Sequence, residues 1–244
     1  MSQEDQGDRN DSASAGKPTA AGYLIGAVFI VFIIGGVVFA LRSGGGDGGD
    51  AHISTASGSS NKLTPDTRKG TPYKGPQITD LAAAAAAAKC VVREDLPEEG
   101  HKHFGPGDPV PDYGTVPPTS GDHIAPPLQQ ADGAWADPAA PANVVHSLEH
   151  GRVAIQYDPT LPKRDQLDLK GLYDTVYSAA LLFPNPDMPY AAAATSWRNL
   201  IGCPTWRGEK TLDAIRAFGV AHWGQGREPM SGFPALGGPS FGDQ

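Results

Sequence analysis

Five side chains that can bind a metal ion or move a proton stand in two parts of the sequence. His146, Glu149 and His150 lie close together, while His103 and His123 stand earlier, among many prolines and glycines. Imidazole nitrogens and carboxylate oxygens are ligands that Zn²⁺ and Cu²⁺ accept. The pattern therefore predicts a metal site made of His123, His146, His150, Glu149 and His103, with zinc or copper as the ion.

Residues 143–150 could adopt either of two backbone conformations. In a helix, His146 and His150 would share one face at positions i and i+4. In the arm of a hairpin, His150 would lie in the turn beside Gly151. The β-branched residues before His146, and a glycine suited to a positive φ, favour the hairpin.

The same residues fit two further interpretations. Their side chains could simply hydrogen-bond the Pro-rich loop onto a sheet, with Glu149 accepting from backbone amides. The segment from His146 to His150 also matches the H-x-x-E-H string of inverted zinc peptidases, a mechanism that needs a long helix and a third ligand. Because Gly151 and an evident strand follow at once, the sequence favours a site without enzyme activity, and we predict no catalytic residue.

Residues 76–230 should form the α+β domain that positions these side chains. The predicted elements are helices over 80–90, 165–182 and 212–223, a half-buried strand over 153–157 and a strand of small residues over 190–197. A long ordered loop, rich in proline and glycine, spans 96–141. We therefore expect a small sheet with two or more packed helices, followed by a Gly/Pro-rich tail over 231–244.

An uncharged apolar run at residues 22–41 dominates the chain before this domain. About 20 helical residues cross the hydrocarbon core of a bilayer, so residues 20–42 predict one transmembrane helix. A cleaved signal peptide is the weaker alternative, because its apolar region is shorter and follows a positive head. The polar residues 1–19 predict a disordered segment and residues 43–75 a flexible linker.

The two cysteines, Cys90 and Cys203, both follow the linker. This placement suits one disulfide in an oxidising compartment, with two buried free thiols as the alternative. We therefore expect a single-pass membrane protein with a cytoplasmic N-terminus and an extracytoplasmic domain. The net charge of −8, without any basic stripe, argues against nucleic-acid binding.

Three motifs in combination resemble a known family. PPTSGDH, VHSLEHGRVAIQY and a later ATSW with a following cysteine are similar to the domain of unknown function 3105 family over about residues 90–230. The resemblance implies a bacterial, often membrane-anchored, extracytoplasmic protein without an assigned activity. The tethered organisation also suits a non-catalytic accessory or assembly module that contacts an envelope protein, which is the alternative to a metal-binding function.

Overall fold

The computed structural model describes residues 58–177 and 179–236, which form an α+β domain. The predicted disordered segment, the transmembrane helix over 20–42 and the first part of the linker lie outside these residues. None of the helices in the described part has the length and hydropathy that a bilayer crossing requires.

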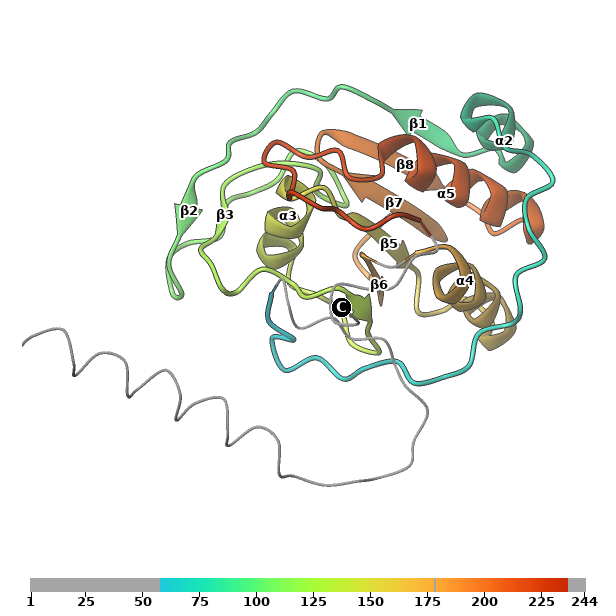
Figure 1. Cartoon of the computed structure of the whole chain (residues 1–244), viewed down its shortest axis with the longest axis horizontal. Helices are drawn as coiled ribbons and strands as arrows, with labels where there is room; N and C mark the ends of the chain where they lie inside the picture. Colours follow the sequence, from blue (N-terminus) through green and yellow to red (C-terminus); the bar gives the residue numbers. More distant parts are fainter. Residues whose placement is uncertain (1–57, 178, 237–244) are drawn as a thin grey trace, which may run out of the picture. The chain divides into compact units, whose positions relative to one another are not determined.

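A six-stranded mixed sheet forms the centre of the domain (Figure 1). Its strands, in spatial order, are β1 (Val91–Arg93), β8 (Asn199–Cys203), β7 (Ala192–Ser196), β5 (Val153–Tyr157), β6 (Ala180–Pro184) and β4 (Gly133–Ala134). Strands β5, β6 and β4 are parallel, whereas β1, β8, β7 and β5 pair antiparallel. A separate parallel pair joins β2 (His103–Phe104) to β3 (His123–Ile124).

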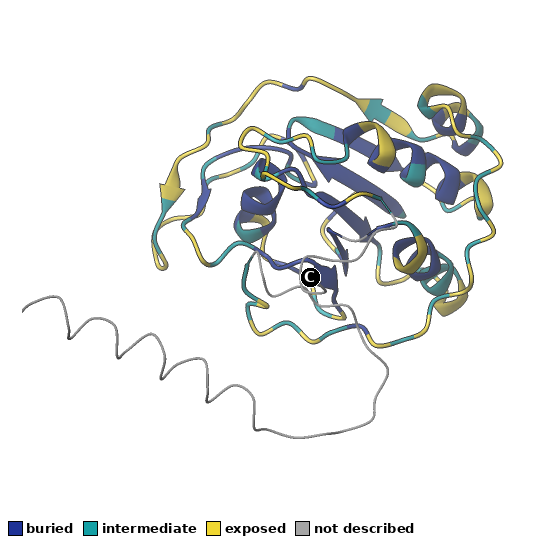
Figure 2. Cartoon of the chain, in the orientation of Figure 1, coloured by how far each residue is buried: buried dark blue, intermediate teal, exposed yellow. Residues whose placement is uncertain are grey.

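Helices cover both faces of this sheet, and the buried residues gather beneath them (Figure 2). The helices of the described residues are α2 (Leu81–Ala88), α3 (Pro141–Glu149), α4 (Lys163–Val176) and α5 (Glu209–His222). Residues of α2, α4 and α5 share one apolar core with the sheet. A second apolar core lies under α3, with Trp135 and Trp197. We call the two sides the α5 face and the α3 face.

Strand β5 is buried on both sides, so the prediction of a half-buried strand is wrong. Val153 and Ile155 belong to the core of the α5 face, whereas Ala154 belongs to that of the α3 face. The polar residue Gln156 is also buried. The sequence alternation is weak because α3 and the long loop cover the face that we expected to meet solvent.

The predicted helix over 165–182 is correct only in its first part. Helix α4 ends at Val176, and residues 180–184 form β6 instead. Leu181 and Leu182 point to opposite faces of the sheet, one into each core. A strand that is buried on both faces shows no alternation of polar and apolar residues. Periodicity alone therefore cannot separate it from the apolar end of the preceding helix.

Residues 58–71 pack against the domain, although their composition predicted part of a flexible linker. Backbone hydrogen bonds join Ser59 to Gln129 and Ala131, and others join Asp66 to Ala134 and Thr71 to Leu167. The buried carboxylate of Asp66 also pairs with Arg68 at 2.7 Å. These contacts are mostly polar, and an expectation built on apolar burial could not foresee them.

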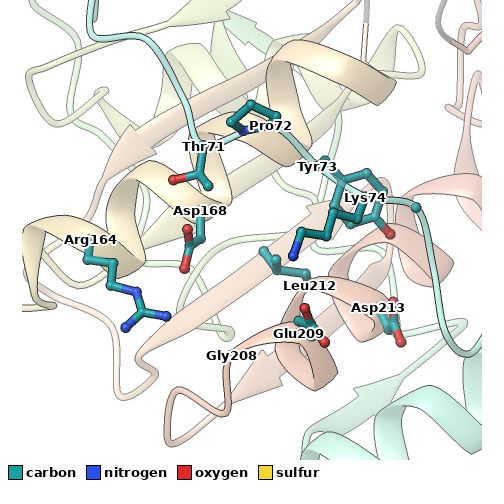
Figure 3. Close-up of a pocket in the computed structure, with 11 residues that line it drawn as sticks. Thr71, Pro72, Tyr73, Lys74, Arg164, Asp168, Gly208, Glu209, Leu212 and Asp213 are labelled. Atoms are coloured by element: carbon teal, nitrogen blue, oxygen red, sulfur yellow. The ribbon is translucent and has the colours of Figure 1, made fainter.

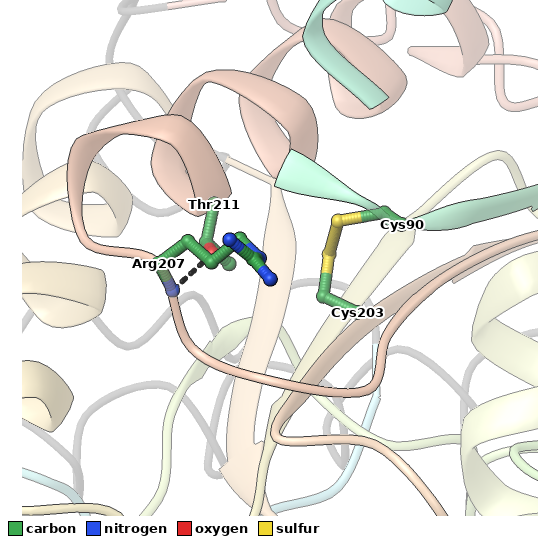
Figure 4. Close-up of a disulfide and its surroundings, with 4 residues drawn as sticks. All are labelled: Cys90, Cys203, Arg207 and Thr211. Atoms are coloured by element: carbon green, nitrogen blue, oxygen red, sulfur yellow. Dashed lines mark hydrogen bonds between the residues drawn. A yellow bond between two sulfur atoms is a disulfide. The ribbon is translucent and has the colours of Figure 1, made fainter. Parts of the chain in front are cut away.

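The predicted disulfide is present between Cys90 and Cys203, which are 113 residues apart (Figure 4). Cys90 lies between α2 and β1, and Cys203 ends β8. The bond therefore fastens the edge of the sheet at the point where the chain enters it. The predictions of α2, β7 and α5 are likewise confirmed, with Asp80 capping α2 by accepting a hydrogen bond from the backbone N–H of Ala83.

Candidate metal centre

Residues 141–149 form helix α3, so the predicted hairpin arm is wrong. Pro141 stands in the first turn, where its missing N–H has no helical partner to lose. Val144 and Val145 pack into the core of the α3 face, and this burial outweighs the preference of β-branched residues for strands. Gly151 has the expected positive φ, +91°, but it follows the helix rather than a hairpin turn.

Four of the five predicted ligands converge on one point. One ligand atom from each of His103, His123, His146 and Glu149 lies within 4.8 Å of the other three. Pairing of β2 with β3 sets His103 opposite His123, and α3 supplies the other two residues. The ring centroids of the three histidines are 4.7 to 4.8 Å apart. His150 lies beside this group, one helical turn from His146.

Backbone carbonyl groups orient three of the imidazole rings. Nδ1 lies near the oxygen of Gly121 in His123 (2.8 Å), of Ile124 in His146 (2.6 Å) and of Glu228 in His150 (3.0 Å). A carbonyl oxygen can only accept, so each Nδ1 carries the hydrogen and each neutral ring presents a lone pair at Nε2. Histidine ligands of metal sites are commonly held in this way.

The Nε2 atoms face other electron-rich atoms. Nε2 of His146 lies 3.1 Å from Nε2 of His150, and Nε2 of His123 lies 3.0 Å from Oε2 of Glu149. The second oxygen of Glu149, Oε1, is buried without a hydrogen-bond partner among the described residues. Each close contact needs a proton or a cation between its two atoms. A metal ion that accepts these lone pairs would satisfy both contacts.

Burial keeps the inner histidines uncharged. It lowers the pKa of His146 to about 3, and it lowers the pKa of His123 despite the neighbouring Glu149 carboxylate. Both rings are therefore neutral near pH 7 and can offer a lone pair to an ion. The carboxylate that faces them is only 1% exposed.

The segment 224–230, which we call the C-terminal strap, lies over the end of α3. The backbone N–H of Gly224 donates to the carbonyl of Gly151, and that of Glu228 donates to the carbonyl of Glu149. Arg227 brings Nη1 to 3.7 Å from Oε1 of Glu149. No motif predicts the strap, because backbone contacts depend little on residue type and Arg227 stands far from the histidines in the chain.

One family model matches most of the domain. It is described as a protein of unknown function, DUF3105, and it matches residues 106–232. The chain belongs to the DUF3105 family. No curated protein and no solved structure matches the chain. The DUF3105 match includes His123, His146 and Glu149 as well as the C-terminal strap, whereas His103 precedes it.

The spacing of the ligand atoms in this DUF3105 chain can be compared with that of a known metal site. Nitrogen ligands about 2.0–2.1 Å from a tetrahedral zinc ion are about 3.3 Å apart. The 3.1 Å between His146 and His150 meets this spacing, as does the 3.0 Å between His123 and Glu149. The widest pair in the group of four, at 4.8 Å, would have to close by about 1.5 Å.

A separate pocket of about 280 Å³ opens between residues 71–75 and helices α4 and α5 (Figure 3). Its charged lining residues are Lys74, Arg164, Asp168, Glu209 and Asp213. Both signs of charge are present and no histidine is among its lining residues. The pocket is therefore distinct from the histidine cluster and offers no comparable set of ligands.

Proposed function

We propose that this DUF3105 domain binds one divalent transition-metal ion, zinc or copper, through His103, His123, His146 and Glu149. The observation that carries the proposal is the set of Nε2 lone pairs that face acceptors. A network that served only to fasten the loop onto the sheet would pair each acceptor with a donor. Here the inner rings have already used their N–H groups on backbone carbonyls.

The burial of Glu149 supports the same conclusion. An ionised carboxylate removed from water is costly unless a positive charge or several donors compensate it. Arg227 approaches only to 3.7 Å, and Oε1 has no hydrogen bond among the described residues. A divalent cation between Glu149 and the neutral rings would supply the missing charge.

The chemistry of the donor set favours zinc or copper over calcium or magnesium. Three imidazoles with one carboxylate are borderline ligands, which suit Zn²⁺ and Cu²⁺, whereas Mg²⁺ and Ca²⁺ prefer oxygen. His150 lies next to His146 and could serve as an additional ligand, because the carbonyl of Glu228 already orients its ring.

We place this function outside the cytoplasm, in a protein anchored to the membrane by residues 20–42. The uncharged apolar run supports the anchor. The disulfide between Cys90 and Cys203 supports an oxidising compartment. Localising a tagged full-length chain, with protease added to intact cells, tests both: cleavage of the domain from outside is expected, and complete protection would contradict this placement.

Metal analysis of the full-length protein tests the binding. The chain is purified in detergent, stripped with a chelator, and titrated with Zn²⁺ or with Co²⁺ as a spectroscopic substitute. We expect one ion per chain and a loss of affinity of at least about 100-fold in His146→Ala, because a ligand is lost. His101→Ala is the matched control, since this exposed histidine pairs with Glu98 outside the cluster.

A wild-type chain that is correctly folded but takes up no Zn²⁺, Co²⁺ or Cu²⁺ would overturn the metal proposal. Equal binding by the wild-type chain and His146→Ala would overturn the assigned ligands. In the first case the histidines would serve to fasten the loop. The accessory or assembly module of an envelope complex would then be the function that the organisation of the chain supports.

A further inference from the structure

One histidine of the cluster is held differently from the others. The side chain of His103 is 39% exposed, whereas His123 and His146 are completely buried. No carbonyl or other hydrogen-bond partner orients the ring of His103 in the described part of the chain. Its only polar contact within the site is with Oε2 of Glu149, at 3.8 Å. His103 can therefore leave the site at a lower cost than the other ligands.

The element that carries His103 is weakly attached. Strand β2 has two residues and, within the described part of the chain, pairs only with β3. Its backbone is joined to the β3 segment by hydrogen bonds from His123 to Lys102 and from Ala125 to Phe104, and the N–H of Lys102 donates to Asp122. Most of residues 101–110 are exposed. Rotation of the His103 side chain, or a small movement of this arm, would open the cluster toward solvent without disturbing a core.

Charged side chains lie beside Glu149, on the outer side of the cluster. Glu98 and Glu149 lie 3.7 Å from the guanidinium of Arg227, and Glu228 lies 2.8 Å from it. With Glu149 serving the metal, Glu98 and Glu228 exceed Arg227 by one negative charge, whereas a divalent ion with Glu149 would carry one net positive charge. These charges offset each other, so a neutral donor that replaces the neutral ring of His103 leaves the balance unchanged.

We propose that His103 is the exchangeable ligand of the metal centre, and that a neutral nitrogen donor of the imidazole type takes its place. The inference rests on the proposed metal binding. It assigns unequal roles to the ligands: His123, His146 and Glu149 retain the ion, while His103 covers the one face through which an external donor reaches it. The donor replaces a group of its own chemical class, so the charge of the centre does not change.

Co²⁺ spectra of the full-length protein test the exchange. His103→Gly should keep one Co²⁺ per chain, with an affinity reduced about 10- to 100-fold. Adding imidazole should restore the wild-type visible spectrum, because the small ring fills the vacated position. Acetate should not restore this spectrum, because an anionic oxygen ligand changes both the donor set and the charge of the centre. His101→Gly, the same substitution on the same arm, should behave as the wild type.

Two results would overturn the proposal while the metal-binding function stands. The first is loss of Co²⁺ from His103→Gly as complete as from His146→Ala. The second is a His103→Gly spectrum that does not respond to imidazole. A wild-type chain that binds no Co²⁺ would instead defeat the metal-binding function itself. N-acetyl-histidine amide, used beside imidazole, separates the sources: restoration by both indicates a histidine of a polypeptide, and restoration by imidazole alone a small molecule.

Discussion

Two buried carboxylates, one on each face of the sheet, have opposite surroundings. Asp213 on α5 is 2% exposed and accepts from the backbone N–H groups of Gln77 and Ile78 at 3.0 to 3.2 Å. Glu149 on α3 is 1% exposed, yet one of its oxygens has no hydrogen bond among the described residues and the other faces imidazole. Asp213 is compensated by backbone donors, whereas the one guanidinium that approaches Glu149 among the described residues, that of Arg227, lies 3.7 Å away.

This difference separates the two faces by function. Asp213 accepts from residues 77 and 78 and so fastens that segment to α5. In the histidine cluster under α3, Glu149 and the Nε2 atoms face one another without hydrogen-bond donors, an arrangement that lowers the stability of the metal-free protein. We infer that the α5 face maintains the fold and that the α3 face carries the binding site.

The largest expected effect is a loss of stability after a substitution in the core of the α5 face. Phe218→Ala removes a ring from the core of the α5 face, where Phe218 is completely buried. It should lower the free energy of unfolding by about 3–5 kcal/mol, measured by urea denaturation. One metal ion per folded chain should still bind. A loss of metal binding in the folded variant would show that the faces are not independent.

The disulfide also stabilises the side of the domain that contains α5. Replacing Cys90 and Cys203 by serine reopens a loop closed over 113 residues and should reduce the free energy of unfolding by about 2–4 kcal/mol. The Co²⁺ spectrum should not change, because neither sulfur belongs to the histidine cluster. The wild-type chain under a reducing agent gives a second measurement, and unchanged stability in both would contradict the expectation.

The sequence predicted the members of the cluster better than their scaffold. Residue types alone selected His103, His123, His146 and Glu149, because imidazole and carboxylate groups are the side chains that bind metals. The conformation of residues 143–150 was not predictable in the same way. Val144 and Val145 have a local preference for strands. The helix forms because both side chains are buried in the core beneath α3.

The parts that the sequence could not predict depend on contacts between distant segments. Residues 180–184 form a strand because they pair with β5 on one side and with β4 on the other. The carbonyls of Gly121, Ile124 and Glu228 orient the rings, but any residue offers a carbonyl. The close approach of the C-terminal strap has one weak signal, Gly226, whose lack of a side chain the structure explains.

Exchanging the two carboxylates for amides tests the comparison directly. Asp213→Asn should lower the free energy of unfolding by about 1–3 kcal/mol, because an amide accepts the backbone N–H groups less strongly, and should leave metal affinity unchanged. Glu149→Gln should leave the metal-free protein as stable or more stable, since it removes a buried charge that Arg227 approaches only to 3.7 Å. Its metal affinity should fall about 10- to 100-fold.

Denaturation and Co²⁺ titration of both variants provide the two readouts. The comparison fails if Glu149→Gln destabilises the metal-free protein as much as Asp213→Asn does. It also fails if the two variants lose metal affinity equally.

The strap offers a smaller change that acts on the α3 face alone. A Cβ atom at position 226 would collide with the backbone oxygen of Glu149, so Gly226→Ala must displace the strap. The carbonyl of Glu228 would then move from His150, and Arg227 from Glu149. We expect about a tenfold loss of metal affinity, the size typical of a lost orienting group.

Gly105→Ala is the matched control for this variant. A Cβ atom at that position meets only the flexible carboxylate of Asp108, at 3.4 Å. Its metal affinity should equal that of the wild type. An unchanged affinity in Gly226→Ala, with a strap that proteolysis shows to be displaced, would exclude the strap from the site.

The smallest expected effect is a pH dependence that belongs to the α5 face. Burial against Phe218 lowers the pKa of His222 below its ordinary 6.5, although Glu94 and Asp95 act in the opposite direction. As the pH falls below 6.5, the unfolded chain binds a proton that the folded chain does not. The stability contributed by the neutral ring is therefore complete above pH 6.5 and decreases below it, by at most about 1.4 kcal/mol per pH unit. In His222→Gln, the free energy of unfolding should decline less steeply between pH 7.5 and 5 than in the wild type. Parallel curves would show that His222 does not contribute.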